Sequence, residues 1–369
     1  MLEKRHLGFV LSYRFPKYIR STTLRQALSA RSDLVIEDAV NTSPKFKRYI
    51  QTIKKILAIR KRNNTSLWLV NFRGHDIYWP LRWLVGRKSR IIFDQLISPY
   101  DAWVNERKTF KRNSLFAKLI YRIERRILAD ADYLTTDSSG QAAYYADLYR
   151  VPLEKFTVIP GSADEAMFSP TAAPRKFDFP EPFVIFTYGT FIPLQGMDLL
   201  LPVAEMLKNL PLRFMIAGGT GRQLEHFLGT REKLGLTNIS HTPWINFTEL
   251  PSYIRGAGLC IGGPLGGSNQ ARRVITGKAL QFLACESPTV IGLTDETRGL
   301  FTDRVNCLLA KPGDADSVAE AISWAYHNQD KLPAIAHAGR LTYEKHYSMA
   351  VLKERVNAFI DSIPADLQA

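Results

Sequence analysis

The stretch Phe183–Gly196 reads FVIFTYGTFIPLQG, and its local pattern decides the fold. Phe183–Tyr188 is an apolar run without regular polar alternation, which indicates a strand buried on both faces of a parallel sheet. Gly189 follows directly, and Met197–Asn209 then has helical spacing. A strand, a glycine loop and a helix in this order are typical of a βαβ unit.

The same alternation of strand and helix extends to both sides of this stretch. In the first half, we predict strands at His6–Tyr13, Ser66–Phe72, Arg90–Gln95, Tyr133–Thr136 and Phe156–Ile159, and helices at Gln51–Arg60, Ser114–Ala129 and Ser139–Tyr149. In the second half, we predict further strands at Leu212–Ala217, Ile239–His241, Gly258–Ile261, Thr289–Ile291 and Cys307–Leu309, and further helices at Gly221–Leu234, Glu249–Gly256, Val274–Cys285, Ala315–His327 and Met349–Ile360.

This pattern predicts an α/β protein with two Rossmann-like, doubly wound parallel-sheet domains that face a cleft. A length of 369 residues also favours two domains. Residues 170–181 are rich in proline and polar groups and are typical of a linker. We therefore expect domains at residues 1–170 and 171–342, and a C-terminal helix at about 343–369 that packs back on the first domain.

The composition excludes several classes of protein. Hydrophobic residues make up 46% of the chain, so it is neither disordered nor fibrous. No apolar run reaches the roughly 18 residues of a spanning helix, and the start MLEKRHLGFVLSYRFP does not have the pattern of a secretory signal. The three cysteines, Cys260, Cys285 and Cys307, match no zinc or redox spacing. We therefore expect a cytoplasmic protein.

The net charge of +14 lies entirely in the first half. Residues 1–170 hold 30 of the 49 Lys and Arg residues but only 16 of the 35 Asp and Glu residues. Such a one-sided field attracts an anionic partner, for example a nucleic acid, an acidic lipid surface or a phosphorylated substrate. Lys45–Arg62 and Arg107–Arg126 each contain eight basic residues and apolar residues at helical spacing. They are either core helices with solvated basic faces or a surface that rests on anionic lipid.

Loops rich in glycine follow three strands of the second half: Gly189–Gly196, Gly218–Arg222 and Gly262–Ser268. Glycine lets backbone N–H groups approach an anion, and the start of the following helix adds a favourable dipole. Because the carboxyl ends of parallel strands meet at one edge of a sheet, the three loops are expected to line one crevice.

Charged and amide side chains follow the third loop. Arg272 and Arg273 are suited to grip a phosphate, and Lys278 to face one as a point charge. Gln281 lies on the same helical face as Lys278 and is suited to bind a sugar hydroxyl. The alternative interpretation makes them surface cations and one exposed amide, and the preceding glycine loop favours the functional one.

Two polar residues of the first half follow predicted strands. Asp94 ends one strand, and a lone carboxylate there is often a cap or turn residue. His75 follows another strand and is either an acceptor contact or a turn residue. Their expected place at the edge that faces the cleft makes both of them candidates for chemistry.

Five segments of the second half have a characteristic order and spacing: YGTFIPLQGMDLLL, FMIAGGTGRQLE, LGLTNISHTPWINFTELPSYI, TGKALQFLACESPTVI and DADSVAEAISWAYHNQ. They resemble the nucleotide-sugar domain of the retaining glycosyltransferases of family four, which have the GT-B architecture. Before the linker, ADYLTTDSSG and VIPGSADEAMFSP also match this family. The resemblance covers roughly residues 130–360 and is looser over residues 1–130.

The resemblance implies roles for individual residues. Gly189 would lie under the donor diphosphate and Gly219 near the nucleotide, while Trp244 and Ile245 would flank the base and Gln281 would touch the ribose. The donor-binding candidates are Gly189, Thr190, Gln195, Gly219, Trp244, Ile245, Gly266, Gly267, Ser268, Arg272 and Gln281, and the catalytic candidates are Asp94, His75, Arg273 and Lys278.

Four positions depart from the usual pattern of the family. Thr190 and Gln195 stand where an Arg and a Lys are common, and Arg273 and Gln281 stand where two glutamates are common. The diphosphate thereby loses its customary cations, and Lys278 with Arg272 or Arg273 is the candidate to replace them.

The resemblance implies transfer of a sugar from a UDP- or GDP-sugar with retention, in which the leaving phosphate oxygen takes the acceptor proton. No Asp-x-Asp motif is present, so we expect no metal and no other cofactor. The basic first half suggests a glycan or lipid-linked glycan acceptor in bacterial cell-surface polysaccharide biosynthesis, with the protein peripheral on the inner membrane face. The alternatives are a nucleic-acid-binding protein and a GT-B-like nucleotide-sugar epimerase. Aromatic residues at core spacing argue against a nucleic-acid partner.

Overall fold

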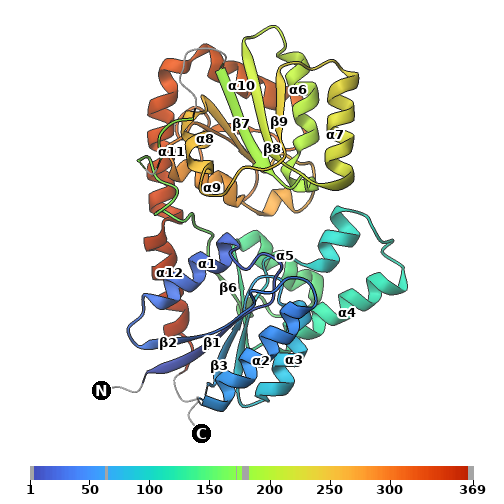
Figure 1. Cartoon of the computed structure of the whole chain (residues 1–369), viewed down its shortest axis with the longest axis vertical. Coiled ribbons are helices and arrows are strands. Elements are labelled where there is room, and N and C mark those ends of the chain that lie inside the picture. Colours follow the sequence, from blue (N-terminus) through green and yellow to red (C-terminus); the bar gives the residue numbers. More distant parts are fainter. Residues whose placement is uncertain (1–3, 63–64, 172, 177–182, 365–369) are drawn as a thin grey trace. The chain divides into compact units, whose positions relative to one another are not determined.

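The computed structural model describes residues 4–62, 65–171, 173–176 and 183–364. The chain forms two compact units, Met1–Gly161 with Met349–Ala369 and Ser162–Ser348. Each unit contains one six-stranded sheet, and each sheet lies between two layers of helices (Figure 1). All strand pairs inside both sheets are parallel, so the predicted α/β fold with two doubly wound sheets is confirmed.

The sheet of the first unit has the order β2-β1-β3-β4-β5-β6. Its strands are β1 (Arg5–Leu11), β2 (Leu34–Val40), β3 (Leu67–Val70), β4 (Arg90–Asp94), β5 (Tyr133–Thr136) and β6 (Phe156–Val158). Its helices are α1 (Ile19–Ser29), α2 (Lys47–Arg62), α3 (His75–Val85), the π-helix η1 (Asp101–Glu106), α4 (Leu115–Asp130), α5 (Ser139–Tyr149) and α12 (Met349–Asp361). Apolar residues of α1 and α12 pack on one face of the sheet, and those of α2 to α5 pack on the other.

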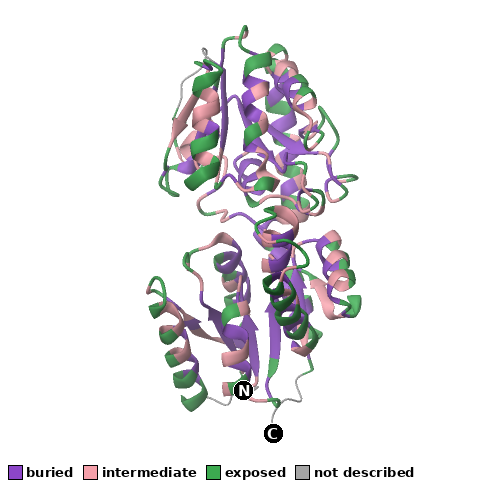
Figure 2. Ribbon diagram, turned by 90° about the vertical axis from the view of Figure 1, so that its right-hand side faces the viewer, coloured by how far each residue is buried: buried purple, intermediate pink, exposed green. Residues whose placement is uncertain are grey.

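The sheet of the second unit has the order β12-β11-β10-β7-β8-β9. Its strands are β7 (Phe183–Gly189), β8 (Leu212–Gly218), β9 (Ile239–Thr242), β10 (Leu259–Gly263), β11 (Thr289–Gly292) and β12 (Leu308–Ala310). Its α-helices are α6 (Leu200–Met206), α7 (Gly221–Lys233), α8 (Leu250–Gly256), α9 (Gly277–Ala284), α10 (Ala315–His327) and α11 (Leu332–Tyr347). One face of the sheet is covered by α6, α7 and α10, and the other by α8, α9 and α11. The strands of both sheets are largely buried, as Figure 2 shows, whereas the helices expose their outer faces.

The boundary between the units differs from the predicted one at residue 170. Ala163 and Phe168 are buried in the core of the second unit, where the Tyr343 hydroxyl lies 3.3 Å from the Ala163 backbone nitrogen. These contacts place the boundary after Gly161. The return to the first unit occurs at Met349, because α11 packs on α9 in the second unit and only α12 packs on α1.

Three α-helices and one strand were not predicted from the sequence. The helix α1 has few apolar residues, α3 contains Pro80 in its interior, and β2 carries Glu37 and Asp38 at the edge of the sheet. Each of these features disfavours the element locally, so tertiary packing stabilises it. The helix α11, by contrast, has buried residues at helical spacing, from Leu332 to Tyr343, so its sequence does carry a helical pattern.

All three cysteines are free and buried, and no helix in the described ranges has both the length and the apolar character needed to span a bilayer.

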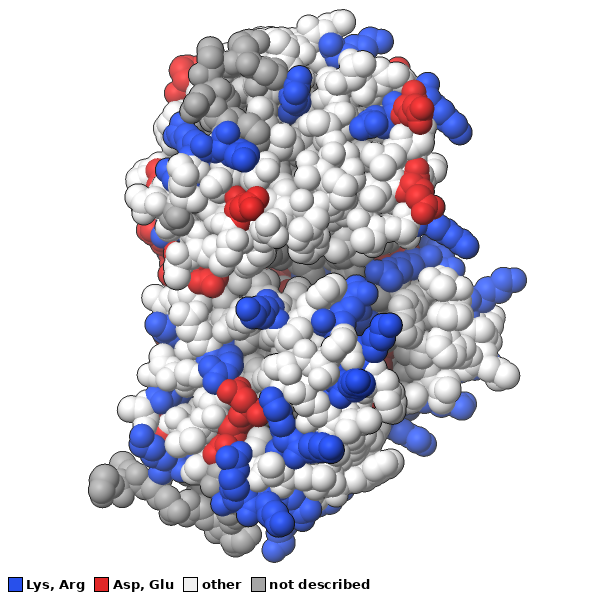
Figure 3. Space-filling model, in the orientation of Figure 1, with Lys and Arg blue, Asp and Glu red and all other residues white. Residues whose placement is uncertain are grey.

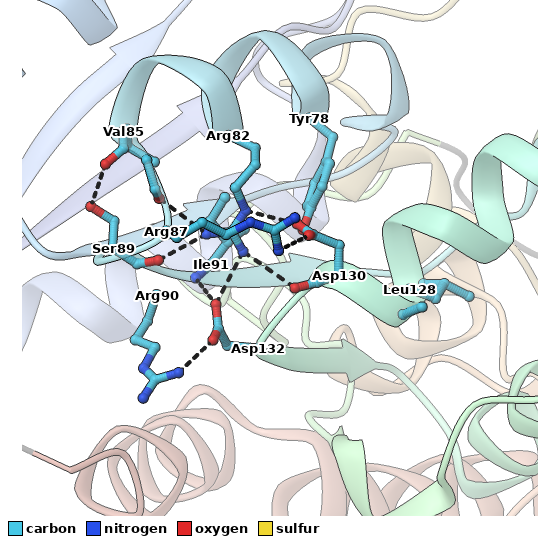
Figure 4. Close-up of polar contacts among 12 residues, drawn as sticks. Tyr78, Arg82, Val85, Arg87, Ser89, Arg90, Ile91, Leu128, Asp130 and Asp132 are labelled. Carbon is cyan, nitrogen blue, oxygen red and sulfur yellow. Dashed lines mark hydrogen bonds and ion pairs between the residues drawn. The ribbon is translucent and has the colours of Figure 1, made fainter.

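A network of buried ion pairs lies where β4 and β5 begin, at the amino edge of the first sheet (Figure 4). The Arg82 guanidinium donates to Asp130 at 2.7 Å, to Asp132 at 3.2 Å and to the Ser89 carbonyl at 2.9 Å. Tyr78 also donates to Asp130, at 2.7 Å. Burial opposes ionisation of Asp130, but the hydrogen bonds from Tyr78 and Arg82 outweigh it and hold the pKa of this carboxyl below its ordinary value.

We predict that Arg82→Ala destabilises the protein by about 3–5 kcal/mol, because it leaves two carboxylates without their buried partner. Arg87 is the matched control, since it pairs with the same Asp130 at 2.6 Å from an exposed position. Arg87→Ala should cost less than about 1 kcal/mol. Urea unfolding at pH 7 measures both values, and equal losses would contradict the role given to Arg82.

Candidate functional site

The three glycine loops meet at the carboxyl edge of the second sheet. The chain runs from β7 to β8 and β9 on one side and places β10, β11 and β12 on the other, so the strand order reverses between β7 and β10. Ligands of doubly wound sheets bind outside the strand ends at this reversal. The first predicted loop follows β7 and the third follows β10, which places both at the expected position.

The first and third loops are in direct backbone contact. The Gly266 N–H donates to the Leu194 carbonyl at 3.0 Å. A Cβ atom on Gly266 would clash with the Pro193 carbonyl oxygen, and one on Gly196 would lie 2.6 Å from the Gly266 nitrogen. Gly196 also has a φ of +64°, which disfavours other residues. Glycine is therefore required where these two loops touch.

The second loop joins the first through another backbone bond. The Gly219 N–H donates to the Gly189 carbonyl at 2.8 Å. The Gln195 side chain lies over Gly189, and its Oε1 atom accepts from the Phe191 N–H at 2.9 Å. Gln195 therefore closes its own loop, while Thr190 stays exposed at the tip.

The Lys278 side chain is buried at the start of α9. Thr276 caps this helix through its hydroxyl, which sets the first residue at Gly277 rather than at the predicted Val274. The Lys278 Nζ atom donates to the Thr187 hydroxyl of β7 at 2.9 Å, and the residue is only 6% exposed. No ion pair with a carboxylate is found for Lys278 among the residues that the structure describes, and no carboxylate contributes to its pKa. Burial lowers the pKa of Lys278 to about 7.

The Gln281 side chain also reaches β7. Its Oε1 atom accepts from the Tyr188 hydroxyl, so Lys278 and Gln281 contact two consecutive residues of that strand. The structure therefore brings these two candidates together with the first glycine loop, and it makes Lys278 and Gln281 buried rather than surface groups.

The other candidates of the second unit differ in exposure. Arg272 and Gly267 are exposed, and Arg273 is partly exposed. The Ser268 hydroxyl accepts from the Ala271 N–H at 3.2 Å and shapes the turn before α9. The two candidates for flanking the base also differ: Trp244 is 73% exposed, whereas Ile245 packs in the core.

In the first unit, Asp94 is a buried counter-charge. Arg20 donates to both of its carboxylate oxygens, at 2.9 and 3.3 Å, and the Thr135 hydroxyl donates at 2.8 Å. Arg20 also holds the carbonyls of Ile159 and Pro160, at 2.7 and 3.0 Å. These contacts give Asp94 a structural role and do not favour the predicted role in catalysis, which remains a prediction.

His75 is the first residue of α3, and its Nε2 atom lies 3.1 Å from Gln95 Oε1 and 3.2 Å from Glu124 Oε1. The partners of the two first-unit candidates, Arg20 and Glu124, were missed by sequence reasoning. Arg20 gave no local signal, but Glu124 is the one acidic residue of the basic stretch Arg107–Arg126. Within the described ranges, no group of three or more His, Cys, Asp or Glu residues is placed to hold a metal ion.

Comparison with known proteins identifies the second unit. Residues 182–328 match the family described as glycosyl transferases group 1. This segment is therefore similar to the glycosyltransferase domains of that family. Its resemblance to the GT-B glycosyltransferases of family four is confirmed.

Two D-inositol 3-phosphate glycosyltransferases are related in sequence. The one from Geodermatophilus obscurus is 28% identical over 242 residues, which cover 60% of this chain and 52% of that protein. The one from Stackebrandtia nassauensis is 31% identical over 106 residues, which cover 26% and 24% of the two chains. The chain thus spans about half or less of the curated relatives that it matches.

Solved structures are similar to this chain over almost its whole length. Sucrose-phosphate synthase from Thermosynechococcus elongatus has a TM-score of 0.74 at 16% identity, with 97% of this chain and 98% of that chain covered. Anabaena HepE, in complex with UDP and glucose, has a TM-score of 0.71 at 12% identity, with 97% and 99% covered. At such identities the likeness establishes the GT-B fold alone.

We predict that Gly266→Ala destabilises the protein by about 1–3 kcal/mol, since its methyl group has no space against the first loop. Gly229→Ala is the matched control, because a Cβ there meets nothing within 4 Å and the position lies inside α7. This control should gain about 0.5–1 kcal/mol from helix propensity. Chemical unfolding of both variants provides the measurement, and a neutral Gly266→Ala would disprove the close contact.

Proposed function

We propose that the protein transfers a sugar, with retention, from a UDP- or GDP-sugar to a glycan or lipid-linked glycan in cell-surface polysaccharide biosynthesis. The observation that carries the proposal is the set of three glycine loops at the strand reversal, next to a buried lysine without an acidic partner in the described chain. The HepE structures with UDP and with UDP-glucose support a nucleotide sugar as the donor.

In this proposal, the second unit stabilises the charge of the leaving diphosphate. Backbone N–H groups of the Gly189 loop and the Lys278 ammonium would supply positioned donors, and such groups contribute several kcal/mol to transition states of this kind. Arg272 or Arg273 would add a second cation. The leaving phosphate would take the acceptor proton, so the proposed reaction needs neither a protein nucleophile nor a divalent ion.

The lowered pKa of Lys278 is consistent with an anion-binding site. A buried ammonium is unfavourable without a counter-charge, and a diphosphate beside it would favour the protonated form. Because the pKa of Lys278 is lower in the folded state than in the unfolded chain, the wild type should gain stability as the pH rises from about 7 to 10.

We predict that UDP or GDP raises the melting temperature of the wild type, since a ligand at 100 times its Kd adds about 2.7 kcal/mol. Lys278→Met should weaken this binding about tenfold or more, because it removes a charge-assisted contact. Without nucleotide, the same variant should be more stable than the wild type at pH 7 and should lose the slope between pH 7 and 10. Lys208→Met, at an exposed lysine of the same unit, is the control.

A panel of nucleotides and nucleotide sugars in a thermal-shift assay, followed by turnover with glycan acceptors, tests the proposal. Stabilisation by none of the nucleotides would contradict the proposed function. Turnover of the nucleotide sugar in the absence of any acceptor would favour an epimerase instead.

We also propose that the first unit rests on an anionic membrane surface from the cytoplasmic side, through the stretches Lys45–Arg62 and Arg107–Arg126. Figure 3 shows Lys and Arg side chains spread over the face of this unit, with few acidic ones. In α4 the buried residues are Ala117, Ile120, Glu124, Ile127 and Leu128, whereas an apolar stripe is exposed. That outward stripe consists of Leu115 (86% exposed), Phe116, Leu119 (52% exposed) and Ile123.

This outer face of α4 combines the two features that bind anionic membranes. The exposed apolar stripe is flanked by the exposed basic residues Lys118, Arg122, Arg125 and Arg126. Apolar side chains gain by entering the headgroup region, and each nearby cation adds about 1 kcal/mol. Ile50 and Leu57 on α2, and Phe46 directly before it, are exposed beside basic residues in the same way.

We predict that the double variant Leu115→Ser/Leu119→Ser binds vesicles that contain phosphatidylglycerol about tenfold more weakly than the wild type. Leu341→Ser is the matched control, because Leu341 is similarly exposed but lies on α11 of the other unit. Co-sedimentation with anionic and zwitterionic vesicles gives the measurement. Equal binding of the wild type to both kinds of vesicle would contradict the proposed surface.

A further inference from the structure

Glu124 is a buried carboxylate on the inner face of a helix whose outer face is strongly basic. It is 1% exposed. Its Oε2 atom accepts three hydrogen bonds, from the Tyr100 N–H at 2.7 Å, the Tyr149 hydroxyl at 2.9 Å and the Ser98 hydroxyl at 3.1 Å. Burial and the charge of Glu124 raise the pKa of Tyr149 well above its ordinary value, so this hydroxyl keeps its proton and donates it.

The other carboxylate oxygen of Glu124 faces His75. The Glu124 Oε1 atom lies at an ion-pair distance of 3.2 Å from His75 Nε2 but makes no hydrogen bond within the described ranges, whereas Gln95 Oε1 is hydrogen-bonded to the same nitrogen at 3.1 Å. Both neighbours are acceptors, and an ionised carboxylate cannot donate. The proton of a neutral His75 ring is therefore held on Nε2, which leaves a lone pair on Nδ1. The ring packs edge-on against Phe93, with centroids 5.0 Å apart.

The Nδ1 atom of His75 has no hydrogen-bond partner within the ranges that the structure covers, although the side chain is 92% buried. A buried acceptor without a partner is unfavourable unless a ligand or water satisfies it. Three other buried polar atoms without partners in those ranges follow the ends of neighbouring strands: Ser12 Oγ after β1, Asn71 Nδ2 after β3 and Gln95 Nε2 after β4. These atoms lie at the carboxyl edge of the first sheet, whose strand order reverses between β1 and β3.

We propose that Glu124 is a positioning residue, which holds His75 so that Nδ1 accepts a hydrogen bond from a hydroxyl group of a sugar substrate. A polyhydroxylated ligand matches the edge, because its hydroxyls both donate to Nδ1 and accept from the amide groups of Asn71 and Gln95. Glu124 itself does not touch the ligand. It fixes the tautomer and orientation of the imidazole, as the second partner of a functional histidine generally does. The inference rests on the proposed sugar transfer for the identity of the ligand.

The variant Glu124→Gln tests this role with little change in volume. Three donors surround the Oε2 position, so the amide oxygen must lie there and the amide NH₂ must face His75 Nε2. The Gln95 amide, whose Nε2 atom has no partner in the described ranges, then turns its NH₂ group toward the same nitrogen as well, so that His75 Nε2 is matched as an acceptor and the proton moves to Nδ1. The tautomer is read from ¹⁵N chemical shifts of the histidine side chains, with His75 assigned by its loss in His75→Asn.

We expect the wild-type ring to carry its proton on Nε2 and the Glu124→Gln ring to carry it on Nδ1. Tyr149→Phe is the matched control, because it removes one bond to Oε2 but leaves the Oε1–His75 contact in place, so it should lower stability without moving the proton. A wild-type ring protonated on Nδ1, or an unchanged tautomer in Glu124→Gln, would overturn the proposal.

Steady-state kinetics of sugar transfer provide a second test of the role proposed for Glu124. In Glu124→Gln, kcat/KM for transfer should fall about 10- to 100-fold, while UDP or GDP stabilises the variant as it does the wild type. A rise in KM for the donor alone assigns the hydroxyl to the donor sugar, and a rise for the acceptor alone assigns it to the acceptor. Wild-type kinetics in a variant with a reversed tautomer would overturn the role in positioning. If the wild type transfers no sugar at all, the proposed function fails, and the tautomer measurement still decides whether Glu124 orients His75.

Discussion

The backbone contact between the first and third glycine loops is the constraint on which the candidate donor site depends. Gly196 and Gly266 let the loops after β7 and β10 touch, with an N–H···O bond of 3.0 Å between them. The second loop is attached to the first through Gly219. This packing turns three separate turns into one continuous surface of backbone groups at the strand reversal, next to Lys278 and Gln281. Side chains larger than hydrogen at the contact would separate the loops.

The two edges of the first sheet differ in how their polar groups are satisfied. At the amino edge, Arg82, Asp130 and Asp132 form a closed network in which each charge has partners. At the carboxyl edge, His75 and Asn71 have buried polar atoms without partners in the described chain. A satisfied network stabilises the fold, whereas unsatisfied buried atoms are unfavourable unless a ligand completes them. The difference separates a structural edge from a candidate binding edge within one sheet.

Much of the fold was predictable because most elements have clear local patterns. The strand Tyr133–Thr136 and the helices Ser139–Tyr149 and Ala315–His327 have the predicted bounds. The helix α3 was missed because Pro80 disfavours it locally, and α9 begins late because the Thr276 cap sets its first residue. The order of the glycine loops, and thus the candidate donor site, was also visible in the chain. Its surroundings were not, since Thr187 and Tyr188 are far from Lys278 and Gln281 in sequence.

The sequence by itself determined the alternation of strands and helices, the three glycine loops and the concentration of positive charge in the first half, because all of these are properties of neighbouring residues. Only the tertiary structure decided which side chains meet. It buried Lys278 against β7, paired Asp94 with Arg20, and turned Glu124, the single acid of the basic stretch Arg107–Arg126, inward toward His75. Burial and pairing depend on residues that lie far apart along the chain. A local sequence pattern therefore does not determine whether a given Lys, Asp or Glu side chain is exposed, buried or paired.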